Sequence, residues 1–386
     1  MDSGPFRNPM NIAIYYHDIY ILVVTIATIL ACKHFQRHAS IPFAGLANVG
    51  SAGTRWHLLI GYLLVVFFSV FIGVRPNDPV FGDTNSYASI YYWNEGSTFA
   101  WKFYPKSFLF TFLIHFCASY SLGLSLFFTL IAFTYFAAAY IAIRKLFPQY
   151  DLLVFCIFLG ALSTYAYSVN GIRAGAAASI FYCAIAYREK PWLCALLLFV
   201  AWGFHHSMHV CIIAFLCVRY YNKPKIYFYF WLFALLLCVL HVSSFQEILG
   251  SITDERGGQY LVDGEGVARM SGRVRYDFIL YSCVPILLGL YFRMKFKVND
   301  VLYDFLLSLY TLLNSLWLLC IQARFNNRIA YLSWQLYPLV ISYIILSKGV
   351  EVNNSLASWK RIVVNGAYLN LLFTLGMFYI YLIFFR

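Results

Sequence analysis

Charged side chains are scarce in this chain: 11% of its 386 residues are Asp, Glu, Lys or Arg, and 62% are hydrophobic. Soluble domains carry about 25% charged residues, so this composition excludes an ordinary soluble protein. The strand alternation of a β-barrel is also absent, whereas apolar runs of helical length recur. We therefore predict an all-α, polytopic integral membrane protein in which residues 1–386 form a single transmembrane domain.

Other absences exclude further classes. The ten cysteines all lie in apolar segments, without the paired spacing in a polar loop that disulfides or a zinc site would need. No Asp-x-Asp motif lies in an expected external loop, so we expect metal-free chemistry and no cofactor. The net charge of +12 is spread between hydrophobic runs instead of forming one basic patch. We therefore expect the lipid bilayer, and no nucleic acid, as a partner.

The apolar runs predict about twelve transmembrane helices. Basic residues follow the first run (Lys33, Arg37), which places that end in the cytoplasm and the N-terminus outside. The spans are expected at 12–32, 56–74, 122–143, 152–167, 173–188, 192–204, 208–218, 226–241, 278–291, 301–321, 330–346 and 362–385. Residues 108–120 are too few for a comfortable span and predict a re-entrant or interfacial helix. Two larger periplasmic loops are expected at 75–107 and 242–276, and the second is suited to act as a lid.

The cations differ in type between the two sides of this topology. Outside there are ten arginines and two lysines, Lys102 and Lys106, whereas inside there are nine lysines and seven arginines. Guanidinium binds phosphate through two parallel hydrogen bonds and stays charged when buried, so the bias favours a pyrophosphate site at the outer face. Its candidates are Arg173, Arg269, Arg273, Arg275, Arg324 and Arg328. The alternative is salt bridges to external carboxylates, which is weaker for Arg324 and Arg328 because no acid lies near them in sequence.

Other polar residues are expected at the same outer face. Asn170, Arg173 and His205 lie at the ends of apolar spans, where ionisable groups are costly and indicate function. Interfacial anchoring is the alternative. Asp83 and Tyr87 lie in the loop 75–107 among several aromatic residues, a composition that suits carbohydrate. For the tryptophans of that loop, an interfacial aromatic belt is an equally good interpretation.

Four short motifs in chain order resemble a known family. They are Asp83 with Tyr87, Ser168-x-Asn170-x-x-Arg173, Phe204-His205-x-Ser207, and Arg328-Ile329-Ala330-Tyr331. Together they resemble the EpsG family of exopolysaccharide polymerases, functional relatives of the Wzy O-antigen polymerases. The chain departs from the family pattern at Ala174, where a polar residue is expected, and at His206, a second histidine.

The resemblance implies a GT-C-like, metal-independent glycosyltransferase of the bacterial inner membrane. It would join undecaprenyl-pyrophosphate-linked repeat units at the periplasmic face to build O-antigen, capsule or exopolysaccharide, with a chain-length regulator as a further partner. The catalytic candidates are His205 or Asp83 as the base and Arg173 at the leaving group. The substrate-binding candidates are Tyr87, Asn170, His206, Ser207, Arg269, Arg273, Arg275, Arg324 and Arg328. Alternatives are an O-antigen ligase, a membrane O-acyltransferase and a lipid-linked oligosaccharide flippase, although internal repeats that would favour a flippase are absent.

Overall fold

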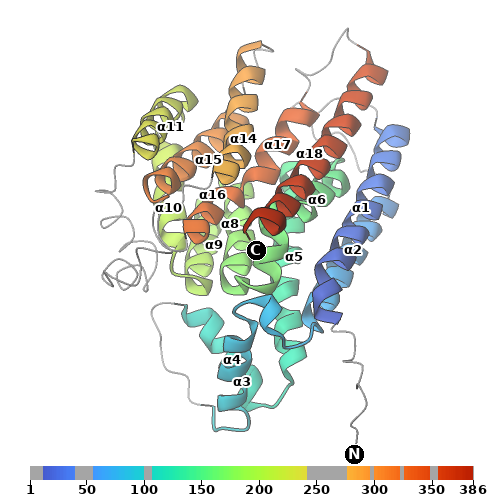
Figure 1. Cartoon of the computed structure of the whole chain (residues 1–386), viewed down its shortest axis with the longest axis vertical. Helices are drawn as coiled ribbons and strands as arrows, with labels where there is room; N and C mark the ends of the chain where they lie inside the picture. The colour runs from blue at the N-terminus through green and yellow to red at the C-terminus, as the bar shows by residue number, and fades with distance from the viewer. Residues whose placement is uncertain are drawn as a thin grey trace, which may run out of the picture.

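The computed structural model describes residues 12–39, 55–99, 107–240, 276–295, 300–321, 326–347 and 355–385. Within these ranges the chain is helical and contains no β-strand, which confirms the predicted all-α class. Figure 1 shows most of the helices running roughly parallel in one bundle, with α3 and α4 at one end of it.

The helices are numbered in chain order. In the first part of the chain they are α1 (Ile12–His38), α2 (Arg55–Gly73), the 3₁₀ turn η1 (Pro79–Phe81), α3 (Thr84–Asn94), α4 (Phe108–Ser119), α5 (Leu124–Leu146), α6 (Asp151–Leu159), α7 (Leu162–Val169) and α8 (Ile172–Ala186). The second part comprises α9 (Pro191–Phe204), α10 (Met208–Tyr220), α11 (Pro224–Val239), α14 (Tyr276–Lys295), α15 (Val301–Leu319), α16 (Asn326–Trp334), α17 (Tyr337–Leu346) and α18 (Leu356–Phe385).

Six helical stretches among the described residues are long and apolar enough to cross a membrane, or seven if the bent pair α6 and α7 is one span. They include α1, α5, α14, α15, α18 and the α16–α17 stretch Arg328–Leu346. The five other predicted spans correspond to apolar stretches of 10–17 residues, at His57–Gly73, Ile172–Ala186, Pro191–Phe204, Met208–Tyr220 and Pro224–Val239. A 15-residue helix is about 22 Å long, less than a hydrocarbon core of about 30 Å. The structure supports a multi-pass membrane protein, but the count of twelve is not confirmed.

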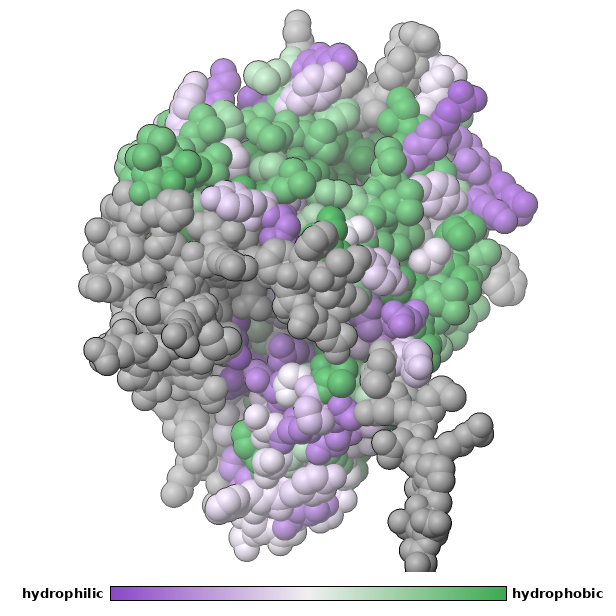
Figure 2. Space-filling model, viewed as in Figure 1, coloured by the Kyte–Doolittle hydropathy of each residue, from purple (hydrophilic) through white to green (hydrophobic). Residues whose placement is uncertain are grey.

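Burial separates central helices from lipid-facing ones. Every residue of α6 is buried, as are nearly all residues of α15 and α17, which is expected for helices that are apolar on all sides. Figure 2 shows hydrophobic residues over much of the visible bundle surface, with hydrophilic ones gathered at the end that holds α3 and at the opposite end. Large apolar side chains point outward from six helices: Leu22, Leu63, Leu196, Leu236, Leu280 and Leu372. Such a wide apolar surface is typical of contact with lipid.

Two helix breaks, between α6 and α7 and between α16 and α17, bring α7 and α16 into contact. The axis bends by 69° between α6 and α7. The second break, between α16 and α17, occurs at Gln335 and Leu336, and Pro338 in the first turn of α17 cannot extend an α-helix backward. The α7 and α16 segments contact each other, and the rings of Tyr167 and Tyr331 lie 5.1 Å apart between centroids. The end of α7 and the start of α16 thus come together.

The predicted loop 75–107 contains regular structure. Its described part forms η1 and α3, and α3 packs against α4, which in turn contacts α5 and α9. Asp78 caps η1, because its carboxylate accepts the backbone N–H of Val80 at 2.9 Å. Residues 100–106 and almost all of the second predicted loop, 242–276, lie outside the described residues. The placement of α4 at a membrane surface stays a prediction.

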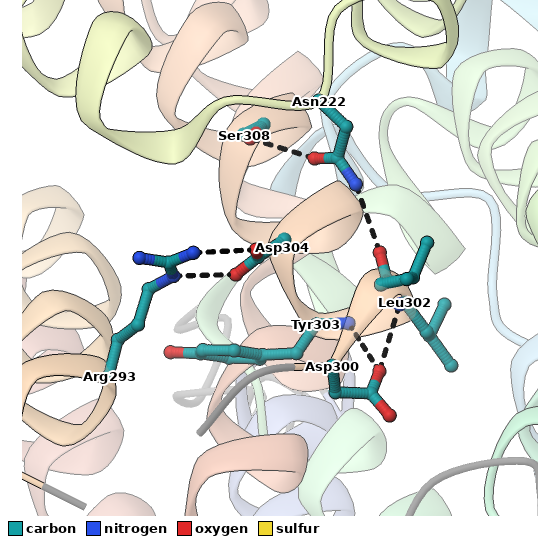
Figure 3. Close-up of polar contacts among 8 residues, drawn as sticks. Asn222, Arg293, Asp300, Leu302, Tyr303, Asp304 and Ser308 are labelled. Carbon is teal, nitrogen blue, oxygen red and sulfur yellow. Dashed lines mark hydrogen bonds and ion pairs between the residues drawn. The ribbon is translucent and has the colours of Figure 1, made fainter. Parts of the chain in front are cut away.

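At the opposite end of the bundle, charged groups are paired. Figure 3 shows the Arg293 guanidinium of α14 facing the Asp304 carboxylate of α15, with bonds of 2.7 and 2.8 Å. Asp300 accepts the backbone N–H groups of Leu302 and Tyr303 and so caps α15. Asp151, only 2% exposed, contacts His57 Nε2 at 3.3 Å and the Tyr140 hydroxyl at 2.8 Å. These contacts are consistent with a structural role for this end.

The arrangement predicts that the two ends lie on opposite sides of a membrane. In a background without native cysteines, Ser86→Cys in α3 should react with an impermeant maleimide in intact spheroplasts. Gln36→Cys, at the far end of α1, should react only after lysis, because both side chains are exposed but at opposite ends of the bundle. Labelling of Gln36→Cys before lysis, or of Ser86→Cys only after it, would contradict the predicted orientation.

Candidate functional site

The site begins at the turn between η1 and α3. Gly82 has a φ of +64°, and a Cβ placed there would lie 2.5 Å from the Asn170 Oδ1 atom. Only glycine accepts both this backbone conformation and this approach. The next residue, Asp83, donates its backbone N–H to the same Asn170 oxygen at 2.9 Å. The two sequence motifs that contain Asp83 and Asn170 are therefore in direct contact.

Arg328, in the first turn of α16, reaches Asp83 from 245 residues away. Its Nη2 atom lies 3.5 Å from Asp83 Oδ2, and both side chains are 40% exposed. The salt-bridge alternative therefore applies to Arg328, because the fold supplies an acid that the neighbouring sequence lacks. An ion pair this exposed contributes about 0–1 kcal/mol, so an incoming anion could displace the carboxylate at little cost.

Arg173 lies in the first turn of α8, next to Tyr87 of α3. Its guanidinium carbon is 5.7 Å from the ring centroids of both Tyr87 and Phe110. The Arg173 Nε atom is buried and has no hydrogen-bond partner within the described part of the chain. Buried polar atoms are rarely left without partners, and exceptions occur at sites that bind a ligand. The N-terminus of α8 adds a partial positive charge, which also favours an anion here.

His205 lies in the break between α9 and α10. Its Nδ1 atom is buried and unpartnered among the residues that the structure describes. Burial, and then the positive charges of Arg173 and Arg328 and the neighbouring His206, lower the pKa of His205 to about 3. The imidazole is therefore neutral at physiological pH, and it can accept a proton.

The remaining candidates surround this group in different ways. Ser207 is buried at the start of α10 and makes no side-chain capping bond there. The backbone oxygen of His206 lies 2.7 Å from His209 Nδ1, and their rings lie 4.7 Å apart. Tyr87 is 5% exposed, with one face toward Arg173, so it offers no open ring for a sugar. The exposed aromatic rings of α3 belong to Tyr92 and Trp93.

Several candidates cannot be placed, and others were missed. Arg269, Arg273, Arg275 and Arg324 lie outside the described residues. His209 was missed, although its spacing of three from His206 at a helix start would have indicated a shared face. Arg75 and Thr84, which bond to each other behind the Asp83 turn, were also missed, because no motif in the neighbouring sequence indicates this contact. No group of three or more His, Cys, Asp or Glu side chains in the described ranges could hold a metal ion.

Residues 59–386 match the model of the EpsG family, so the chain belongs to that family. Membership indicates a membrane protein of polysaccharide biosynthesis. No curated protein and no solved structure matches the chain.

The contact between Gly82 and Asn170 predicts a specific loss of stability. Gly82→Ala should destabilise the purified protein, because the new methyl group must displace the Asn170 side chain and the backbone stays at positive φ. Gly96→Ala is the matched control: Gly96 has a φ of +67°, and nothing lies within 4 Å of its Cβ position. The control should cost about 1–2 kcal/mol from the backbone alone, and Gly82→Ala on the order of 1–3 kcal/mol more.

Thermal unfolding in detergent measures both variants. Equal shifts in Tm for Gly82→Ala and Gly96→Ala would mean that the approach of Asn170 to Gly82 is not a close contact in the folded protein.

Proposed function

We propose that this member of the EpsG family is a polysaccharide polymerase. It transfers a growing glycan from undecaprenyl pyrophosphate to a hydroxyl of an incoming lipid-linked repeat unit, at the periplasmic face of the bacterial inner membrane. In this step the acceptor oxygen bonds to the anomeric carbon of the donor, and the bond from that carbon to the pyrophosphate oxygen breaks. A base takes the acceptor proton, and the lipid pyrophosphate leaves with the bonding electrons.

One observation carries this proposal: chemistry-bearing residues from four separate segments meet at one end of the bundle. Asp83 contacts Asn170 and Arg328 directly, and the charges of Arg173 and Arg328 both act on His205. At the other end Arg293 and Asp304 form a bidentate ion pair. At this end the buried polar atoms without a hydrogen-bond partner in the described ranges include Arg173 Nε and His205 Nδ1. Substrate groups would supply those partners.

The arginines suit the pyrophosphate of the donor. Arg173 is already oriented at the start of α8, where backbone N–H groups also point toward an anion. Arg328 would exchange its weak contact with Asp83 for a phosphate, and the Asp83 carboxylate would become free to accept a hydrogen bond from a sugar hydroxyl. Fixed positive charges aimed at the departing diphosphate stabilise the transition state more than the ground state.

His205 and Asp83 are both suited to act as the base. His205 is neutral, but with its low pKa it is a weak base in the unloaded site. Burial is the larger cause of the low pKa, but a bound pyrophosphate would offset the charges of Arg173 and Arg328, so the pKa of His205 would rise from its value in the unloaded site. The donor would thus activate the base, and it would have to bind before the proton is transferred.

The alternatives differ in what they require of these residues. A ligase would use the same donor chemistry with another acceptor. A flippase would bind the same pyrophosphate but would need no proton acceptor beside it. A membrane O-acyltransferase would pair His205 with an activated acyl group and would not need two arginines at an anion site.

Lysine substitution tests the geometry of anion binding. Arg173→Lys and Arg328→Lys keep the charge but lose the two-pronged guanidinium, so turnover should fall by roughly 10–100-fold for one lost charge-assisted bond. Arg37→Lys, on the exposed end of α1, should behave as wild type. The measurement is the length and density of the polymer ladder together with membrane abundance. Full activity of both variants would leave the pyrophosphate to other arginines.

The pH dependence tests how His205 is activated. The kcat/KM profile reports the free enzyme, where His205 stays neutral, and should be level between pH 7 and pH 5. The kcat profile reports the loaded enzyme, where the raised pKa should move the acid limb to higher pH, since protonated His205 cannot act as a base. Coincident acid limbs for kcat and kcat/KM would contradict activation by the donor.

A further inference from the structure

Arg75 lies just after α2 and is 4% exposed. Among the described residues, its guanidinium group bonds to neutral oxygens and to no carboxylate. The Nη1 atom donates to the Ile72 carbonyl at 2.8 Å, Nε and Nη2 donate to the Thr84 hydroxyl at 3.3 and 3.1 Å, and Nη2 approaches the Val169 carbonyl at 3.4 Å. One face of the guanidinium covers the Phe128 ring at 4.1 Å. The group is therefore enclosed and fixed in direction.

The charge of Arg75 makes this environment unusual. Among the residues that the structure describes, no carboxylate forms an ion pair with it. Burial lowers the pKa of Arg75 to about 10, so the group still carries its proton at neutral pH. A buried charge without a counter-ion is costly, and folded proteins keep one only where its hydrogen bonds are well satisfied. The bonds to Thr84 and to the two carbonyls meet that requirement.

Two of the oxygens that Arg75 bonds, the Thr84 hydroxyl and the Val169 carbonyl, belong to residues that adjoin Asp83 and Asn170 of the candidate site. Thr84 follows Asp83, and Val169 precedes Asn170. The Thr84 hydroxyl in turn donates to the Val169 carbonyl at 2.9 Å. Arg75, Thr84 and Val169 thus form a second layer of contacts behind the bond between Asp83 and Asn170.

We propose that Arg75 is a positioning residue of the candidate site. Through Thr84 and Val169 it holds the Asp83 turn against Asn170. The role in turnover rests on the proposed function, whereas the role in holding the turn does not. Arg75 is enclosed by protein and touches no substrate, so it acts on the reaction only through the residues that it places. Five N–H donors in a fixed plane reach three oxygens at once, which a lysine ammonium on a flexible chain cannot reproduce.

Kinetics on five single variants and one double variant test the proposal. Arg75→Lys and Thr84→Val should lower kcat by roughly 10–100-fold, the loss typical of a small displacement of catalytic groups. Thr84→Ser, which keeps the hydroxyl, should stay near wild type, and so should Thr134→Val, whose hydroxyl bonds only to its own helix. The double variant Arg75→Lys/Asp83→Asn should be no slower than Asp83→Asn, because a residue that acts through Asp83 adds nothing once Asp83 is altered.

Hydrogen exchange gives a readout that does not depend on activity. In Arg75→Lys and Thr84→Val, peptides covering residues 76–94 should exchange faster, because the Asp83 amide is no longer held against Asn170. Peptides from α11 should be unchanged. A merely structural role would instead lower abundance and raise exchange throughout the bundle, with additive losses in the double variant.

The outcomes separate the two proposals. Faster exchange at 76–94 with full activity of Asp83→Asn would overturn the role of Asp83 in the proposed function and keep Arg75 as the residue that holds the turn. Unchanged exchange and unchanged kcat in both Arg75→Lys and Thr84→Val, with Asp83→Asn impaired, would overturn the role of Arg75.

Discussion

The hydrogen bond from the Asp83 amide to the Asn170 side chain is the contact on which the candidate site depends. It joins the segment of η1 and α3 to the turn between α7 and α8. Asp83 and Asn170 are 87 residues apart in the chain. Gly82 permits the approach, and Arg75 supports it from behind. Three residues beyond Asn170, Arg173 lies in the first turn of α8 beside Tyr87, and Arg328 contacts Asp83.

Short and broken helices surround this contact. A span that crosses lipid must satisfy its backbone internally, so non-helical backbone at membrane depth occurs only where protein or water surrounds it. Asn170 and His205 lie in the turns that precede α8 and α10, and Arg328 lies in the first turn of α16. The same breaks that reduce the number of full-length spans therefore bring the polar residues together.

The sequence was sufficient for the helical class and the positions of nearly all helices, and it placed on one face Asp83, Asn170 and Arg328, which the structure brings into contact. Apolar periodicity and the ends of apolar runs carry that information locally. It was not sufficient for the number of full spans, because an apolar run of 13–16 residues looks alike whether it crosses lipid or ends inside a bundle. The partner of Arg328 could not be predicted either, since 245 residues separate it from Asp83. The burial of Tyr87 and the role of Arg75 depend on the tertiary contacts of α3 with α7 and α8.

The central claim is that these residues form a site that joins glycans carried on lipid pyrophosphate. The most direct measurement uses purified protein in liposomes with a lipid-linked single repeat unit and follows both the lipid-linked products and the released lipid pyrophosphate. We predict products that grow by whole repeat units, with one lipid pyrophosphate released for each unit added, in wild type and only weakly in Arg173→Lys. Movement of the unit across the bilayer without any longer product or release of lipid pyrophosphate would contradict the account.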